Sequence, residues 1–269
     1  MRAWRNLKTR WRRRLRAPAC HPALAANRTL EDRHKGQRCF ILATGPSIKQ
    51  QDLRRLRGEL LISVSNFFVH PHNAEITPQY HCVPAFHPPI EEESWQRWLA
   101  EMAAANPKAT LLFSITDLER NQRQGQFAGR ALHFLDFTGS WETIAAEGVD
   151  LTRAVPAPQS VTVMALYLAL YLGCDPIHLL GCDHDWILHV NQSTHFYSEG
   201  QHALVRGNYN EWFGGDFGTY CEDYVRLWQQ YRALRAAAAK RSTRILNATA
   251  GGLLDVFQRV NYESVTGGA

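Results

Sequence analysis

The sequence predicts a Rossmann-like α/β domain, in which a mostly parallel sheet is flanked by helices and a long lid loop lies at the carboxyl edge. Three observations lead to this fold class. From Arg38 onward, short apolar segments alternate with helix-like segments, which is the βαβ pattern. The first apolar segment leads directly into a Gly-Pro-Ser turn. Residues 184–215 lack a regular pattern, and so long a loop in a compact domain is usually functional or disordered; its histidines and aromatic residues favour a functional lid.

Strands are expected where short apolar runs are bounded by turn residues. They cover residues 38–44, 59–68, 80–86, 110–115, 131–137, 176–183 and 243–249. Helices are expected over residues 47–58, 90–105, 159–173 and 217–241. The segment 90–105 begins with acidic residues, which suits the positive end of a helix. The segment 159–173 is apolar nearly all round, so it should be buried, and Gly173 should end it.

The first 36 residues differ in charge from the rest of the chain. They carry eleven Lys or Arg residues against two acids, a net charge of +9. Apolar residues recur on one side at helical spacing: Trp4, Leu7, Trp11 and Leu15. Such a helix, over residues 1–18, can lie on an anionic membrane surface, although a disordered basic tail or an RNA contact fits the composition too. Residues 17–36 are expected to be a linker, and the folded domain is expected to span 37–269.

The folded body is mildly acidic, since the whole chain carries +5 and the remainder therefore −4. A nucleic-acid partner is not expected, because such a domain would need a basic face. The chain has no apolar run of the roughly 20 residues that a membrane span needs, no signal-peptide pattern and no C-x-x-C pair. The expected location is the cytoplasm, with a peripheral contact at the inner face of the plasma membrane if the arm binds there.

The turn Thr44-Gly45-Pro46-Ser47 follows the first predicted strand. In an open parallel sheet, ligands bind outside the carboxyl ends of the strands, where the strand order reverses. Gly45 permits close approach of a ligand, Pro46 suits a first helical turn, and Ser47 can cap a helix or donate to a phosphate. The turn is neither a Walker loop nor the dinucleotide G-x-G-x-x-G motif. It predicts an anion site, although a plain strand-to-helix turn explains it equally well.

Three other junctions carry polar residues. Asn66 ends the second strand, where it could read a base or sugar edge or serve as an ordinary turn residue. Gln159 and Ser160 open the buried helix, where Ser160 is a natural N-cap. Asp183 and Asp185 follow the strand 176–183, and because side chains alternate in an extended segment, these two would face the same way. Either a catalytic or ligand-fixing acid or a metal site fits this last pattern.

With these pieces in order, the sequence resembles a known group of proteins. The carrying segments are RCFILATGPSIKQQDL, ISVSNFF, QSVTVMALYLALYLGCDPIHLLGCDHDW, HFY and ILNATAGGLLDVFQRVNYES. From Arg38 to Ser264 they resemble the bacterial surface-polysaccharide proteins of the DUF115 group, whose domain is named for the archaeal 6-hydroxymethylpterin diphosphokinase. More loosely, the chain is similar to the bacterial sialyltransferases of glycosyltransferase family 42, which use CMP-sialic acid.

The sialyltransferase resemblance implies an inverting transfer without metal or other cofactor. A lid histidine would take the acceptor proton, with His195 first and His202 second, since histidine titrates near neutrality. Asp183 would be the third catalytic residue, and Tyr197 would support the leaving phosphate. The residues implied to bind nucleotide or phosphate are Thr44, Gly45, Pro46, Ser47, Asn66, Gln159, Ser160, Asp185 and Tyr197.

The chain departs from the sialyltransferase pattern at three positions. Two tyrosines that hold the leaving phosphate correspond to His178 and Asp185 here, and an aspartate would repel a phosphate unless a cation intervened. An asparagine commonly stands in place of Thr44. These differences leave the leaving-group machinery and the metal dependence open.

The predicted function is therefore a glycosyltransferase that moves a sugar from a nucleotide-activated donor, CMP-linked by resemblance, to a surface glycan or lipid-linked glycan. One alternative is a diphosphokinase, in which Asp183 and Asp185 would hold the Mg²⁺ that ATP chemistry needs. A second alternative is a non-catalytic protein of polysaccharide assembly. The sequence carries no information on the donor sugar, the acceptor or the oligomeric state.

Overall fold

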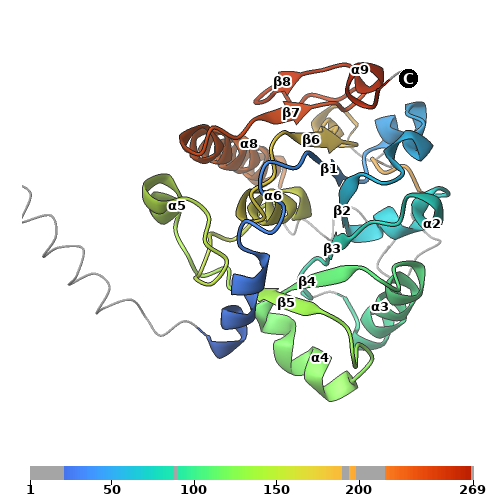
Figure 1. Cartoon of the computed structure of the whole chain (residues 1–269), viewed down its shortest axis with the longest axis vertical. Helices are drawn as coiled ribbons and strands as arrows, with labels where there is room; N and C mark the ends of the chain where they lie inside the picture. Colours follow the sequence, from blue (N-terminus) through green and yellow to red (C-terminus); the bar gives the residue numbers. More distant parts are fainter. Residues whose placement is uncertain (1–20, 88–89, 190–193, 198–215, 268–269) are drawn as a thin grey trace, which may run out of the picture.

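An eight-stranded sheet forms the centre of the described part of the chain. The computed structural model describes residues 21–87, 90–189, 194–197 and 216–267 (Figure 1). Neighbouring strands are all parallel, in the order β5-β4-β3-β2-β1-β6-β7-β8. The strands are β1 Cys39–Leu42, β2 Leu60–Val64, β3 Tyr80–Cys82, β4 Thr110–Ser114, β5 Leu132–Leu135, β6 Ile177–Leu180, β7 Ile245–Asn247 and β8 Gln258–Arg259. The strand order reverses between β1 and β6, so the predicted Rossmann-like class is confirmed.

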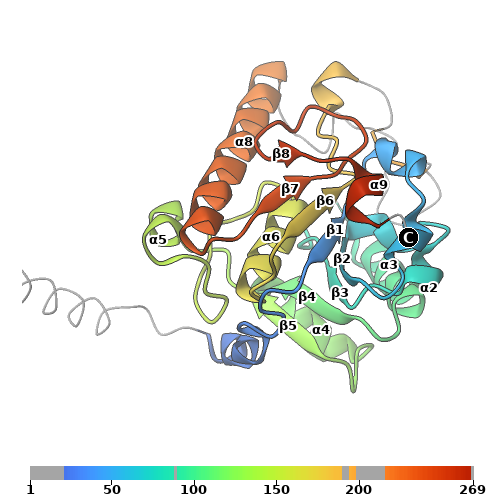
Figure 2. The same cartoon turned by 45° about the horizontal axis from the view of Figure 1, so that its top comes forward.

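Helices cover both faces of this sheet, as Figures 1 and 2 show. On one face lie α5 Trp141–Glu147, α6 Val161–Tyr171 and α8 Phe217–Lys240. On the other lie α2 Asn73–Ile76, α3 Glu92–Ala105, α4 Leu118–Gln124 and α9 Tyr262–Val265. Short 3₁₀ helices occupy Pro22–Leu30, Pro46–Gln50, Leu53–Leu56, Ser65–Val69, Ile115–Asp117 and Trp186–Leu188. In the part of the chain that the structure describes, no helix has the length and apolarity that a membrane crossing requires.

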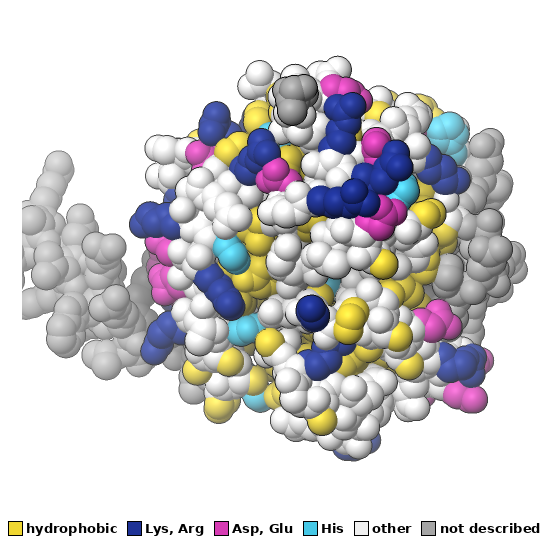
Figure 3. Space-filling model, turned by 45° about the vertical axis from the view of Figure 1, so that its right-hand side comes forward, with side chains coloured by type: hydrophobic (Ala, Val, Ile, Leu, Met, Phe, Trp, Pro, Cys, Tyr) yellow, Lys and Arg dark blue, Asp and Glu magenta, His cyan; other side chains and the backbone are white. Residues whose placement is uncertain are grey.

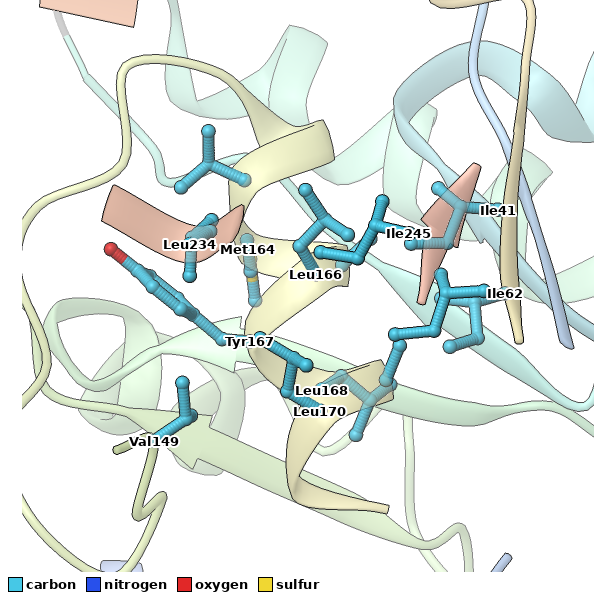
Figure 4. Close-up of a cluster of buried hydrophobic side chains, with 14 of the residues drawn as sticks. Ile41, Ile62, Val149, Met164, Leu166, Tyr167, Leu168, Leu170, Leu234 and Ile245 are labelled. Carbon is cyan, nitrogen blue, oxygen red and sulfur yellow. The ribbon is translucent and has the colours of Figure 1, made fainter. Parts of the chain in front are cut away.

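The helix α6 is the centre of the largest apolar core (Figure 4). Every residue from Thr162 to Tyr171 is buried, as the all-round apolar sequence predicted. The strands place alternate side chains on opposite faces. In β1, Ile41 packs in the core around α6, whereas Phe40 belongs to a second cluster on the other face. The Tyr167 hydroxyl inside the first core donates to the Pro156 carbonyl at 3.1 Å.

Most predicted strands and one predicted helix are shorter than the sequence suggested, and two of these differences have a visible cause. The expected helix 47–58 is a pair of 3₁₀ helices, since the backbone is extended at Gln51, whose side chain donates to the Ala248 carbonyl at 2.7 Å. Asp52 then starts the second 3₁₀ helix by accepting from the Arg54 N–H. The expected strand 59–68 ends at Val64 because Ser65 adopts a positive φ of 48°.

The expected linker over residues 17–36 is wrong for the stretch 22–30. Leu24, Asn27 and Leu30 are each fully buried there. The Asn27 amide donates to the backbone carbonyls of Phe134 and Leu151, both at 2.7 Å, which fixes this segment beside β5. The folded body therefore begins before residue 37, whereas the basic arm, residues 1–18, lies outside the described residues.

Charged side chains of both signs are interspersed on the face shown in Figure 3. Elsewhere among the described residues, side chains of opposite charge form ion pairs. Arg54 pairs with Asp52 at 2.7 Å, and Arg38 pairs with Glu59. No large area of one charge sign is visible on this face.

Candidate active site

A cavity of about 240 Å³ lies at the carboxyl edge of the sheet, where the strand order reverses between β1 and β6. Its walls come from the ends of β1, β2 and β6, the start of α6, the first turns of α8 and the segment 194–197. This is the position at which open α/β sheets bind ligands. The volume approaches the lower end of typical ligand pockets, about 300 Å³.

Asp183 joins the end of β6 to the turn after β1. Its buried carboxylate accepts hydrogen bonds from the Ser47 backbone N–H at 3.1 Å and the Ser47 hydroxyl at 2.9 Å. Burial raises the pKa of Asp183, and the bonds from Ser47 oppose that shift. Gly45 must be glycine, because a Cβ there would overlap the Asp183 carboxylate and the Gly181 carbonyl. Asp183 is therefore a brace between two loops of the cavity.

The turn after β1 does not offer the free N–H groups that the sequence suggested. Gly45 N–H donates to the Gly181 carbonyl at 2.8 Å, Ser47 N–H donates to Asp183, and Pro46 has none. The anion at this turn is thus the chain's own carboxylate. Thr44 and Gly45 line the cavity, whereas Pro46 and Ser47 do not.

The amino end of α6 opens into the same cavity. Gln159 and Ser160 line it, as expected. Ser160 is the N-cap, and its hydroxyl accepts from the Thr162 N–H at 3.2 Å. Within the described residues, neither the Ser160 nor the Val161 N–H has a hydrogen-bond acceptor in the chain. These groups and the helix dipole make this end of α6 the better place for an anion.

His195 lies on the cavity wall beside the end of β1. Its Nδ1 is 3.1 Å from the Thr44 hydroxyl oxygen, and its ring stacks on Tyr197 with centroids 5.0 Å apart. Burial lowers the pKa of His195 to about 4, so the imidazole is neutral at pH 7. A neutral imidazole can accept a proton. The second candidate base, His202, lies outside the described residues.

Asp183 and Asp185 both line the cavity, as does His184. His184 between them has a positive φ of 46°, and its Nε2 lies 2.7 Å from the Tyr231 hydroxyl. The Oδ2 atom of Asp185 lies 3.5 Å from Nε2 of His189. Among the described residues, no three His, Cys, Asp or Glu side chains are grouped to hold a metal ion. Ser47 donates one hydrogen bond to each Asp183 oxygen, so part of the acceptor capacity of this carboxylate is used within the chain.

Besides Pro46 and Ser47, three further residues suggested by the sequence do not reach the cavity. Asn66 is buried, and its side-chain oxygen accepts from the Trp98 indole N–H, so it is a core residue rather than a wall residue. His178 lies within β6 and stacks on Phe40 at 4.8 Å, away from the cavity. Tyr197 lies behind His195 and supports its ring.

The wall formed by α8 was not predicted. Tyr220, Asp223 and Tyr224 contribute to the cavity from one side of this helix. The Tyr224 hydroxyl donates to the His184 carbonyl, and burial raises the pKa of Tyr224 to about 12. Their i, i+3, i+4 spacing is visible in the sequence and could have indicated this shared face. Ser65, strained at a positive φ, lines the cavity too.

Comparison with known proteins gives a likeness of fold. No family model matches the chain, so the resemblance to the DUF115 group gains no support, and no curated protein matches either. Solved structures with this fold include the sialyltransferase CstII from Campylobacter jejuni with the substrate analogue CMP-3FNeuAc, at a TM-score of 0.51 and 12% identity, over 87% of this chain and 89% of that chain. Structures of CST-II with CMP and with trisaccharide acceptor and CMP give TM-scores of 0.52 and 0.50, at 12% and 13% identity and the same coverage. The chain therefore has the Rossmann-like α/β fold of a solved sialyltransferase.

Proposed function

We propose that this protein is a glycosyltransferase that takes a sugar from a CMP-activated donor and transfers it to a glycan acceptor. One observation carries the proposal: a single cavity at the switch point of the sheet combines the amino end of α6 with a neutral histidine, His195. The first can bind a phosphate and the second can accept a proton. The fold shared with a sialyltransferase that has been solved with CMP ligands supports the choice of nucleotide.

The donor phosphate would lie at the amino end of α6. The N–H groups of Ser160 and Val161 would donate to its oxygens, and the helix dipole would favour its charge. In this proposal the anion site is at α6, whereas the turn after β1 is held closed by Asp183.

The acceptor hydroxyl would lose its proton to His195 as its oxygen attacks the anomeric carbon of the donor sugar. The bond from that carbon to the phosphate oxygen breaks, CMP leaves with the electron pair, and the configuration inverts. Tyr224 is suited to donate a hydrogen bond to the leaving phosphate, because its hydroxyl lines the cavity side of α8 and is protonated at neutral pH. Its present acceptor, the His184 carbonyl, would be exchanged for a phosphate oxygen.

Asp185 and Asp183 have different parts in this proposal. A carboxylate beside a phosphate repels it, so Asp185 would accept hydrogen bonds from hydroxyl groups of the donor sugar or the acceptor. Asp183 would act indirectly, by keeping the turn 44–47 in place. The surface-glycan acceptor, whether or not it is lipid-linked, remains a prediction from the sequence.

A thermal-shift comparison tests the proposal. The purified protein is heated with CMP, UDP, GDP or ATP, each with and without Mg²⁺. A ligand at 100 times its Kd stabilises a protein by about 2.7 kcal/mol. We expect CMP to stabilise the protein most, to an equal extent with and without Mg²⁺. If ATP together with Mg²⁺ is the one combination that stabilises the protein, the result would contradict the proposal and favour the diphosphokinase.

A further inference from the structure

Gln230 of α8 makes two hydrogen bonds to the backbone that leads into α6. Its Oε1 accepts from the Gln159 N–H at 2.8 Å, and its Nε2 donates to the Ala157 carbonyl at 3.0 Å. A backbone N–H can only donate and a carbonyl can only accept, so these two partners fix which way the amide of Gln230 points. Among the described residues, neither backbone group makes another hydrogen bond. The side chain of Gln230 thus supplies the partners that a neighbouring strand would otherwise give.

The segment 156–159 belongs to no helix or strand. Pro156 and Pro158 have no N–H group. The Pro156 carbonyl accepts from the Tyr167 hydroxyl at 3.1 Å, inside the core. The hydrogen bonds further along the segment come from Gln230. Two buried side chains from different helices therefore determine the path of the chain into α6.

Gln230 lies in the packed contact between α8 and α6. Its side chain is 4% exposed, and it does not line the cavity. Leu227, Tyr231 and Leu234 share its face of α8, because residues three and four apart lie side by side on a helix. All three are buried in the core around α6. Gln230 is therefore held in place by α8, and it reaches the cavity through the backbone of its partners.

The residues directly after this segment carry the groups proposed to bind the donor phosphate. Ser160 and Val161 line the cavity, and their N–H groups have no acceptor among the described residues. The N–H of Gln159, one residue earlier, is used by Gln230. The free N–H groups at this end of α6 therefore begin at Ser160. Because α8 also places Tyr224 on the cavity wall, the bonds from Gln230 fix the free N–H groups of α6 relative to that hydroxyl.

A second residue of α8 supports this contact between the helices. Arg226, one turn before Gln230, pairs through Nη1 with Oδ1 of Asp223 at 2.9 Å and lies 3.4 Å from Oε1 of Gln159. Asp223 and Gln159 both line the cavity, one from each helix. Arg226 is half-exposed, so its ion pair contributes less than the buried bonds of Gln230. Two separate contacts therefore join α8 to the start of α6 beside the cavity.

We propose that Gln230 is a positioning residue, which sets the place of the Ser160 and Val161 N–H groups by holding the segment 157–159. The effect on the donor phosphate rests on the proposed function, whereas the holding of the segment does not. Gln230 touches no substrate in this account and acts only through the backbone at the start of α6.

Amide hydrogen exchange, followed by NMR, tests the hydrogen bonds in the wild-type protein. Without ligand, we expect the Gln159 amide to exchange at least about 100-fold more slowly than the amides of Ser160 and Val161, because Gln159 alone of the three has an acceptor among the described residues. Added CMP should slow exchange at Ser160 and Val161 and leave Gln159 unchanged. Equal exchange at the three amides in the free protein would overturn the inference.

Variants separate positioning from stability. Gln230→Met keeps the length of the side chain without its hydrogen bonds. The matched control is Asn27→Leu, which removes two bonds to the backbone from another buried amide that does not line the cavity. By calorimetry, we expect Gln230→Met to weaken CMP binding about tenfold or more, because small displacements of positioned groups are costly. The control should keep the Kd of CMP within about threefold of wild type, since distant sites act independently.

The urea midpoint should fall in both variants, because each loses buried hydrogen bonds. A Gln230→Met protein that is destabilised but binds CMP as wild type does would overturn the inference. Gln230→Glu is the second variant: its carboxylate cannot donate to the Ala157 carbonyl, so it should weaken CMP binding too, and wild-type affinity would count against the inference. If neither variant folds, the exchange pattern of the wild-type protein decides. Slow exchange at Gln159 without CMP binding to the wild type would count against the proposed function alone, and the holding of the segment would stand.

Discussion

The Gly45→Ala substitution tests whether Asp183 braces the cavity. The added methyl group would overlap the Asp183 carboxylate and the Gly181 carbonyl, so one of the two must move. Overpacking of this kind costs about 1–3 kcal/mol. If the carboxylate moves, the two hydrogen bonds from Ser47 are lost as well, and bonds to charged groups contribute about 1.5–3 kcal/mol each. Because these terms are not additive, we expect a loss of about 3–5 kcal/mol.

Urea unfolding of the purified protein measures this loss. The matched control is Gly251→Ala, whose methyl group would meet Ser47 Cβ at 3.5 Å and Asp183 at 3.9 Å, which are ordinary contacts. We expect the control to change the free energy of unfolding by less than about 1 kcal/mol. If Gly45→Ala costs no more than the control, the reasoning about the brace is refuted.

Three further predictions concern other parts of the chain. Asn27→Ala should lower the free energy of unfolding in urea by about 2–4 kcal/mol, because it leaves two buried carbonyls without donors. A loss below about 0.5 kcal/mol would mean that residues 22–30 do not stabilise the fold. The pKa of His195 is lowered to about 4, so the native state binds fewer protons than the unfolded state between about pH 4 and 6.5, and this residue makes the free energy of unfolding rise with pH in that range. His195→Asn should therefore flatten the rise of unfolding free energy with pH. An unchanged slope would contradict the lowered pKa. Tyr224→Phe should lower the kcat of CMP release about tenfold or more while CMP still binds, and an unchanged kcat would exclude Tyr224 as the phosphate donor.

The fold was predictable because its signals are strong and local. The all-round apolar segment that becomes α6 has few alternatives to burial, and the apolar runs of β1, β2 and β6 read clearly as strands. The strand β8 escaped prediction because its two residues, Gln258 and Arg259, are polar and exposed. The sequence does not indicate that the segment 22–30 packs on the fold, because asparagine is usually a surface residue and Asn27 is fully buried.

The site was predictable in position but not in detail. The sequence identified the carboxyl ends of β1 and β6, the start of α6 and His195, all of which meet at one cavity. The partners of individual groups depend on residues distant in the sequence. The Ser47 N–H donates to the carboxylate of Asp183, 136 residues away in the sequence. The side-chain oxygen of Asn66 accepts from the indole N–H of Trp98, 32 residues away. No local pattern near Ser47 or Asn66 reports these contacts.

A crystal structure with bound CMP tests the central claim most directly. Our account predicts the phosphate within hydrogen-bond distance of the N–H groups of Ser160 and Val161, in the cavity that His195 also lines. A phosphate bound at any other place on the protein, with the start of α6 left without a ligand, would contradict it.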